Sequence, residues 1–157
     1  MTDQPQDPLS TKLLRLNDTK LLHPMAVHIP NGMVPVAALF MGAGCLFKFQ
    51  PLIWAALFNL GMIFLAMPWV LLTGVASWKF RYRGAKTPLF KTKIRSSIVL
   101  FAGSGAIIVW QIFRPVSAES ITPEAWAMAA AYAALLIPTA WAGSLGGKLV
   151  FGPRKKL

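Results

Sequence analysis

The sequence predicts an all-α, polytopic membrane protein: four transmembrane helices in a compact bundle, with a short amphipathic segment before them. Of its 157 residues, 55% are hydrophobic and only 13% are charged, which is about half the charged share of an ordinary globular protein. Four long apolar runs follow one another, and basic residues gather at their ends. A chain of this composition cannot cover a soluble surface with polar groups, so we expect the apolar runs to lie in lipid.

The predicted spans follow from the apolar runs. They cover about residues 31–47, 52–77, 97–113 and 125–147. A helix needs roughly 20 residues to cross the hydrocarbon, so the third run is near the lower limit. With their flanks the spans form one domain at 21–152. It lies between a cytoplasmic N-terminal segment at 1–20, with the spacing of an amphipathic helix, and a basic tail at 153–157.

Two connections on the other side of the membrane have recognisable signals. The letters KFQP between the first two spans predict a tight hairpin. Before the fourth span, Thr122 and Pro123 are typical of a helix N-cap and of the first helical residue. We therefore expect the fourth helix to begin at Pro123.

The basic residues predict the orientation of the bundle. Fourteen lie in the N-terminal segment, between the second and third spans, and at the C-terminus, whereas only Lys48 and Arg114 lie on the other side. Basic segments stay on the cytoplasmic face. The sequence therefore predicts a cytoplasmic-membrane protein with both termini inside, which agrees with an even number of spans.

The segment between the second and third spans is expected to contact anionic lipid headgroups, or else a cytoplasmic partner. Its basic residues are Lys79, Arg81, Arg83, Lys86, Lys91, Lys93 and Arg95. In a soluble protein the net charge of +11 would suggest nucleic acid. Here the charges alternate with apolar runs, so we expect as partners the bilayer and other membrane subunits or a second copy, and no nucleic acid.

The candidate site lies in LLHPMAVHIPNG, at residues 21–32. Both histidines of the chain, His23 and His28, are here, each close to a proline, and Asn31 follows. A proline cannot donate to the carbonyl four residues earlier, so Pro35 leaves the carbonyl of Asn31 without its helical donor. We predict that His23, His28 and Asn31 form one polar site that binds a quinone or haem. The competing interpretation is that the imidazoles only cap the helix and satisfy freed carbonyls.

Small residues predict close helix contacts. Ala38 with Gly42 and Gly143 with Gly147 are four apart, and Gly103 and Gly105 flank Ser104. Such residues let helix backbones approach each other in lipid. The pattern does not distinguish contacts inside one bundle from contacts with a second copy.

Three segments resemble a known family. HPMAVHIP (23–30) is similar to the HPxxVHFP signature of the bacterial inner-membrane family called domain of unknown function 2231. AGSLGGKLVFG (142–152) resembles that family's closing segment, and TGVASW (73–78) resembles its second-helix exit. The resemblance implies a four-helix membrane protein without implying an activity. The chain departs from the family at Asn31-Gly32, where apolar residues are usual. It also has Lys93, Arg95 and Ser144 where many members carry a further histidine.

The sequence lacks the residue patterns that several classes of function need. All five acidic residues lie outside the predicted spans, whereas ion-coupled transport places acids within them. The single cysteine, Cys45, allows no internal disulfide and no cysteine cluster for zinc or iron–sulfur. No serine or cysteine has a histidine and an acid beside it in the sequence, so we do not expect an enzyme on its own.

Three functional hypotheses stay open. The first is a non-catalytic membrane subunit or anchor of an electron-transfer complex, linked to quinone or haem. The second is an electron carrier that binds haem b, although two histidines on one segment cannot grip one iron from both faces of a regular helix. The third is a structural or assembly protein with no ligand.

Overall fold

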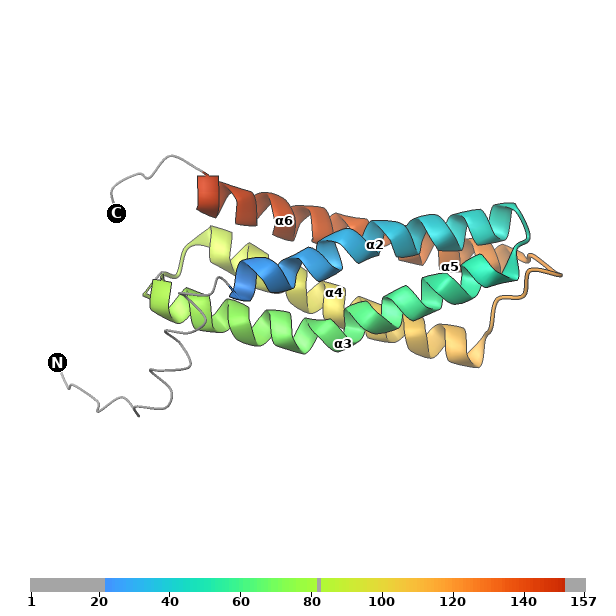
Figure 1. Cartoon of the computed structure of the whole chain (residues 1–157), viewed down its shortest axis with the longest axis horizontal. Helices are drawn as coiled ribbons and strands as arrows, with labels where there is room; N and C mark the ends of the chain where they lie inside the picture. The colour runs from blue at the N-terminus through green and yellow to red at the C-terminus, as the bar shows by residue number, and fades with distance from the viewer. Residues whose placement is uncertain (1–21, 82, 152–157) are drawn as a thin grey trace.

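The computed structural model describes residues 22–81 and 83–151, and it confirms the all-α bundle (Figure 1). The segments predicted at 1–20 and 153–157 lie outside the described residues. The helices are α2 (Leu22–Leu46), α3 (Gln50–Arg81), α4 (Pro88–Phe113), α5 (Pro123–Ala134) and α6 (Leu136–Phe151). Figure 1 shows α2, α3 and α4 running back and forth along the long axis, with α5 and α6 completing a fourth rod.

The bundle has two ends with different connections. We call the end with the α2–α3 hairpin and the α4–α5 connection the hairpin end. The opposite end holds the start of α2, the α3–α4 connection and the end of α6 (Figure 1). We call it the basic end, because the basic residues from Lys79 to Arg95 lie in its connection and the adjoining helix turns.

Four segments of the described chain are long and apolar enough to cross a membrane: His23–Leu46, Gln50–Lys79, Pro88–Phe113 and Pro123–Leu145. Large apolar side chains point outward from them, among them Leu39, Leu65 and Leu72, each about two-thirds exposed or more. In water such a surface would be unstable, and in lipid it is the expected one. The chain is therefore a multi-pass membrane protein.

The first helix starts earlier than the predicted span at 31–47. It begins at Leu22 and continues through both Pro30 and Pro35. Pro24 lies in the first turn, where a helical N–H has no partner in any case. Each internal proline removes one hydrogen bond, whereas ending the helix would leave more backbone groups unpaired in lipid. The histidine segment is thus regular helix rather than an irregular entry.

The connection at the basic end is shorter than the predicted loop. Helix α3 has 32 residues and continues to Arg81, and α4 already begins at Pro88. At a rise of 1.5 Å per residue, α3 is about 48 Å long. Gly84 takes a left-handed φ of +67°, and its N–H donates to the carbonyl of Trp78 at 3.0 Å, which closes the C-terminus of α3. Lys91, Lys93 and Arg95 therefore belong to α4.

The hairpin end agrees with the sequence signals. Residues 47–49 alone connect α2 to α3, which confirms a tight hairpin. Thr122 is the N-cap of α5: its hydroxyl accepts from the N–H of Ala125 at 3.4 Å, and Pro123 is the first helical residue. The side chain of Gln50 joins the two connections, because it accepts from the N–H of Ala118 at 2.8 Å and donates to the carbonyl of Val116 at 3.3 Å.

The fourth span is broken into α5 and α6 at Leu135. Pro138 has no N–H to donate to the carbonyl of Ala134. The N–H of Leu135 turns to the carbonyl of Tyr132 at 3.2 Å, and Thr139 resumes the helical pattern by donating to Leu135 at 3.3 Å. A proline within a span that was predicted as one helix therefore divides it.

The orientation of the bundle can be measured with reporter fusions. If the four segments cross the membrane, residue 86 in the α3–α4 connection and residue 118 in the α4–α5 connection lie in opposite compartments, because α4 runs between them. We expect a cytoplasm-active reporter to work at residue 86 and a periplasm-active reporter to work at residue 118. Activity of the same reporter at both positions would contradict the four-span topology.

Candidate functional site

Polar side chains from three helices meet at the basic end. His23 comes from the first turn of α2, Thr73 from α3 and Lys93 from the second turn of α4. The Nδ1 atom of His23 lies 3.2 Å from the Thr73 hydroxyl, and the Lys93 ammonium lies 3.4 Å from Nε2 of the same ring. We call these three residues, with Gly74, the His23 cluster.

The donors and acceptors of the cluster can be assigned in order. The Thr73 hydroxyl donates within its own helix, to the carbonyls of Trp69 at 2.9 Å and Val70 at 3.2 Å. Its oxygen can then accept a hydrogen bond from the Nδ1–H group of His23. Lysine only donates, so Nε2 accepts from Lys93. The arrangement corresponds to a neutral imidazole with its proton on Nδ1, held from both sides.

Gly74 makes room for the imidazole. A Cβ atom at this position would lie 3.0 Å from Cε1 of His23 and 3.5 Å from Nδ1. The ring therefore packs on the bare backbone of α3, and any larger residue at 74 would push the ring away. Thr73 and Gly74 were not predicted as site residues, although both lie in the TGVASW segment.

Lys93 differs from the other basic residues of its segment. Its side chain is half-buried in the cluster, whereas those of Lys79, Arg83, Lys86, Lys91 and Arg95 are exposed; the side chain of Arg81 lies outside the described part. The only acidic residues that the structure describes, Glu119 and Glu124, lie at the hairpin end. Lys93 therefore has no described carboxylate beside it, and two of its three N–H groups have no described acceptor. Lys93 was predicted to contact headgroups or a partner with the other basic residues, whereas its ammonium lies against His23.

The other two predicted site residues have different neighbours. His28 lies on an exposed face of α2 and makes no hydrogen bond to a described residue. The carboxamide of Asn31 lies against α6, where a Cβ at Gly143 would be 3.5 Å from its Nδ2 atom. Five residues of a regular helix turn through about 500°, so His28 is rotated about 140° from His23. The structure thus does not bring His23, His28 and Asn31 into one site.

Helix packing brings the first of the three segments that carry the family resemblance against the second, and the residue that follows it against the third. HPMAVHIP contacts TGVASW through His23 with Thr73 and Gly74. Asn31, which directly follows the first segment, contacts the closing segment at Gly143. Residues 50 and more apart in sequence are thus brought together by helix packing.

The described residues do not fit a haem held by both histidines of one chain. Both ring nitrogens of His23 have protein partners, so neither offers a free lone pair to iron. His28 points to another side of α2. Among the described residues there is also no group of three His, Cys, Asp or Glu side chains that could hold a metal ion.

A buried hydrogen-bonded pair between α4 and α5 was not predicted. The Tyr132 hydroxyl of α5 donates to Oε1 of Gln111 in α4 at 2.7 Å, and both side chains are buried. Gln111 was visible in the sequence as a polar residue within a span. Its partner could not be predicted from the sequence, because Tyr132 lies among alanines and fits the apolar pattern of the span.

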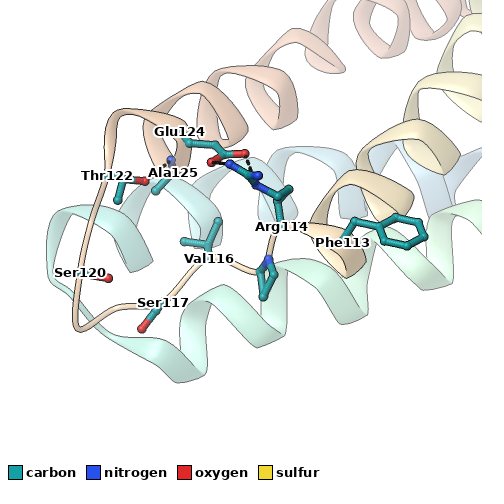
Figure 2. Close-up of a pocket in the computed structure, with 9 residues that line it drawn as sticks. Phe113, Arg114, Val116, Ser117, Ser120, Thr122, Glu124 and Ala125 are labelled. Carbon is teal, nitrogen blue, oxygen red and sulfur yellow. Dashed lines mark hydrogen bonds and ion pairs between the residues drawn. The ribbon is translucent and has the colours of Figure 1, made fainter.

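The hairpin end carries a cavity of about 220 Å³ under the α4–α5 connection (Figure 2). Figure 2 shows the Arg114 guanidinium lying on the Glu124 carboxylate, with bonds of 3.1 and 2.9 Å. This hydrogen-bonded carboxylate raises the pKa of Arg114. The ion pair is largely exposed, and exposed pairs contribute little to stability. The cavity is open to the surroundings, and its two charged side chains, Arg114 and Glu124, already pair with each other.

Comparison with known proteins identifies one relative. No protein-family model matches the chain, and no solved structure matches it. An uncharacterized protein of the archaeon Archaeoglobus fulgidus is 31% identical over 98 residues, which cover 62% of this chain and 78% of the relative. An alignment of this identity that covers more than two-thirds of the relative establishes common descent, so the chain belongs to the same family as this archaeal protein.

Proposed function

We propose that the protein is a non-catalytic membrane subunit or anchor of an electron-transfer complex, and that its His23 cluster binds the head group of a quinone. The observation that carries the proposal is the half-buried ammonium of Lys93, which reaches the imidazole of His23 between three helices. Its remaining N–H groups suit a quinone carbonyl, because a charged donor makes the stronger kind of hydrogen bond.

The position of the cluster supports a ligand that enters from the bilayer. Lys93 is the sixth residue of α4, about 8 Å along the helix from its start at 1.5 Å per residue. A side chain at this height lies near the boundary between hydrocarbon and headgroups, where the polar ring of a quinone with an apolar tail would lie. His23 fixes the ammonium in place, and Gly74 and Thr73 fix His23.

The same proposal places the basic end at the cytoplasmic surface of the membrane. The exposed Lys79, Arg83, Lys86, Lys91 and Arg95 would contact anionic headgroups on the cytoplasmic face of a bacterial inner membrane. Both termini would lie on that face. Membership of the family called domain of unknown function 2231 belongs to this proposal as well, since it rests on the segments quoted from the sequence.

Quinone binding can be measured by tryptophan fluorescence, since Trp78 lies at the basic end and donates to the carbonyl of Ala85 at 2.9 Å. The purified protein in mild detergent would be titrated with a short-chain ubiquinone. Lys93→Met should weaken binding by about tenfold or more, because a hydrogen bond from a charged group contributes roughly 1.5–3 kcal/mol. Lys91→Met removes the same charge from an exposed position two residues away and should have no effect.

The outcomes separate the three hypotheses. Equal effects of Lys93→Met and Lys91→Met, or no quinone binding by the unmodified protein, would reject the proposal. A Soret band in the absorption spectrum of the purified protein would favour the haem b carrier. If Lys93→Met and His28→Ala both leave ligand content and partner activity intact, the protein has a structural or assembly role.

A further inference from the structure

Helix α2 carries polar groups at membrane depth, on its exposed side and at its groove with α6, that the described bundle does not satisfy. We call this surface the α2 face, and it consists of His28, Asn31 and Gly32 with the groove beside them. His28 is exposed and makes no hydrogen bond to a described residue, and neither does the carboxamide of Asn31. Polar side chains within spans normally face the bundle interior and pair there. Two unpaired groups within one helical turn therefore indicate that something else covers this face.

A groove accompanies these side chains. A cavity of about 250 Å³ opens between α2 and α6, lined by Asn31, Pro35, Leu136, Thr139, Ala140 and Gly143. Pro35 cannot donate to the backbone carbonyl of Asn31, so an acceptor in addition to the carboxamide lies at its edge. The groove is apolar apart from these groups and the Thr139 hydroxyl, which already donates to the carbonyl of Leu135 at 2.8 Å.

Gly32 allows another helix to come close. A Cβ atom at this position would meet nothing within 4 Å, so the glycine packs against nothing in its own bundle. By contrast, a Cβ at Gly103 would lie 2.9 Å from a methyl group of Leu135, and one at Gly105 would lie 2.9 Å from the ring of Phe64. These two glycines have a packing role within the bundle, whereas Gly32 has none there. Small residues on a lipid-facing surface are typical of helix association in membranes.

We propose that the α2 face is a two-fold dimer interface between two copies of this chain. The face carries two groups that can pair with each other across an interface. The exposed imidazole of His28 can donate and accept hydrogen bonds. Asn31 lines the groove and offers its carboxamide and its backbone carbonyl. About a two-fold axis normal to the membrane, His28 of each copy can enter the groove of the other, because an isologous interface pairs residue i with j and j with i. The two residues are three apart, about 4.5 Å in height, which a side chain can bridge.

The inference is independent of the quinone site, because the His23 cluster faces α3 and α4. The competing occupants of the α2 face are a helix of a different membrane protein and the chain's own residues 1–21. They lack the reciprocity that two copies of one surface provide, and the experiment separates them.

The first experiment is cross-linking through cysteine at position 32. Purified Gly32→Cys in liposomes of phosphatidylethanolamine and phosphatidylglycerol would be oxidised with copper phenanthroline, and the dimer read on a non-reducing gel. We expect a cross-linked dimer for Gly32→Cys and none for Leu65→Cys, which is 72% exposed on α3. The unmodified chain is the background, since its only cysteine, Cys45, is buried. Equal cross-linking at positions 32 and 65 would overturn the proposal.

The second experiment measures association without a cysteine. Energy transfer between labelled copies, followed as lipid dilutes the protein, gives the dissociation constant. Asn31→Leu and His28→Leu should each weaken association by about tenfold. Asn59→Leu is the matched control, because the carboxamide of Asn59 already donates to Ala55 of its own helix at 2.8 Å. If Gly32→Cys in native membranes forms a cross-linked product whose mass is not that of two copies, a different protein occupies the face and the proposal is overturned. A monomer at every dilution would also overturn the proposal.

Discussion

Gly44→Ala should make the protein less stable than Gly42→Ala by about 1–3 kcal/mol, the usual cost of overpacking. A Cβ at Gly44 would lie 2.7 Å from Cγ1 of Ile53 and 3.1 Å from its backbone nitrogen. Because part of this contact is backbone, a change of rotamer cannot relieve it, and the start of α3 would have to move. Gly42 lies two residues earlier in the same helix, and a Cβ there would meet nothing within 4 Å.

The comparison of the two variants isolates the contact. Both substitutions gain the helix propensity of alanine over glycine, about 1 kcal/mol, so that gain cancels in the difference. The free energy of unfolding would be measured by titration with sodium dodecyl sulfate in mixed micelles and followed by circular dichroism. Equal stability of the two variants would show that α2 and α3 are not packed this closely at the hairpin.

The second large effect is expected at the buried pair of Gln111 and Tyr132. Tyr132→Phe leaves the carboxamide of Gln111 without its donor, and Gln111→Leu leaves the Tyr132 hydroxyl without its acceptor. Each single change should lower the free energy of unfolding by about 1–3 kcal/mol, because an unpaired polar group stays buried. The double variant should cost less than the sum, since both polar groups are then gone.

A double-mutant cycle measures the strength of this hydrogen bond. We expect a coupling free energy of roughly 0.6–1.7 kcal/mol, between the average and the maximum measured for side-chain hydrogen bonds between transmembrane helices. The same unfolding titration supplies all four stabilities. Strictly additive effects of the two substitutions would mean that α4 and α5 do not share this bond.

The sequence predicted the helices better than their ends. Apolar runs mark the part of a helix that lies in hydrocarbon, but a helix continues as long as its backbone bonds are satisfied. Hence α2 extends back to Leu22 past His23, and α4 back to Pro88 past Lys93, where polar side chains suggested a loop. Where a local signal exists, as at Thr122, the predicted helix start agrees with the structure.

The candidate site was only partly accessible to sequence reasoning. His23 stood out as one of two histidines, but its partners lie 50 and 70 residues away in the chain, and no periodicity links such distant positions. The grouping of His23 with His28 rested on their closeness in the sequence, each beside a proline. Once the segment is regular helix, 100° of rotation per residue separates the two rings. The role of Gly74, which is to leave room for the imidazole of His23, becomes apparent only from the packing of α2 on α3.

Helix α3 is longer than the membrane is thick. Its approximately 48 Å exceed the roughly 30 Å of hydrocarbon in a typical bilayer by several turns, and the surplus is accommodated by tilt or by emergence into the headgroups. Thr73 lies eight residues before the end of α3, in the part of the helix that is close to the edge of the hydrocarbon. Lys93 lies at the same level, because His23 joins it to Thr73. The local thickness of the bilayer thus determines the hydration of Lys93: thinner bilayers expose its ammonium to water, and thicker bilayers place it closer to the acyl chains.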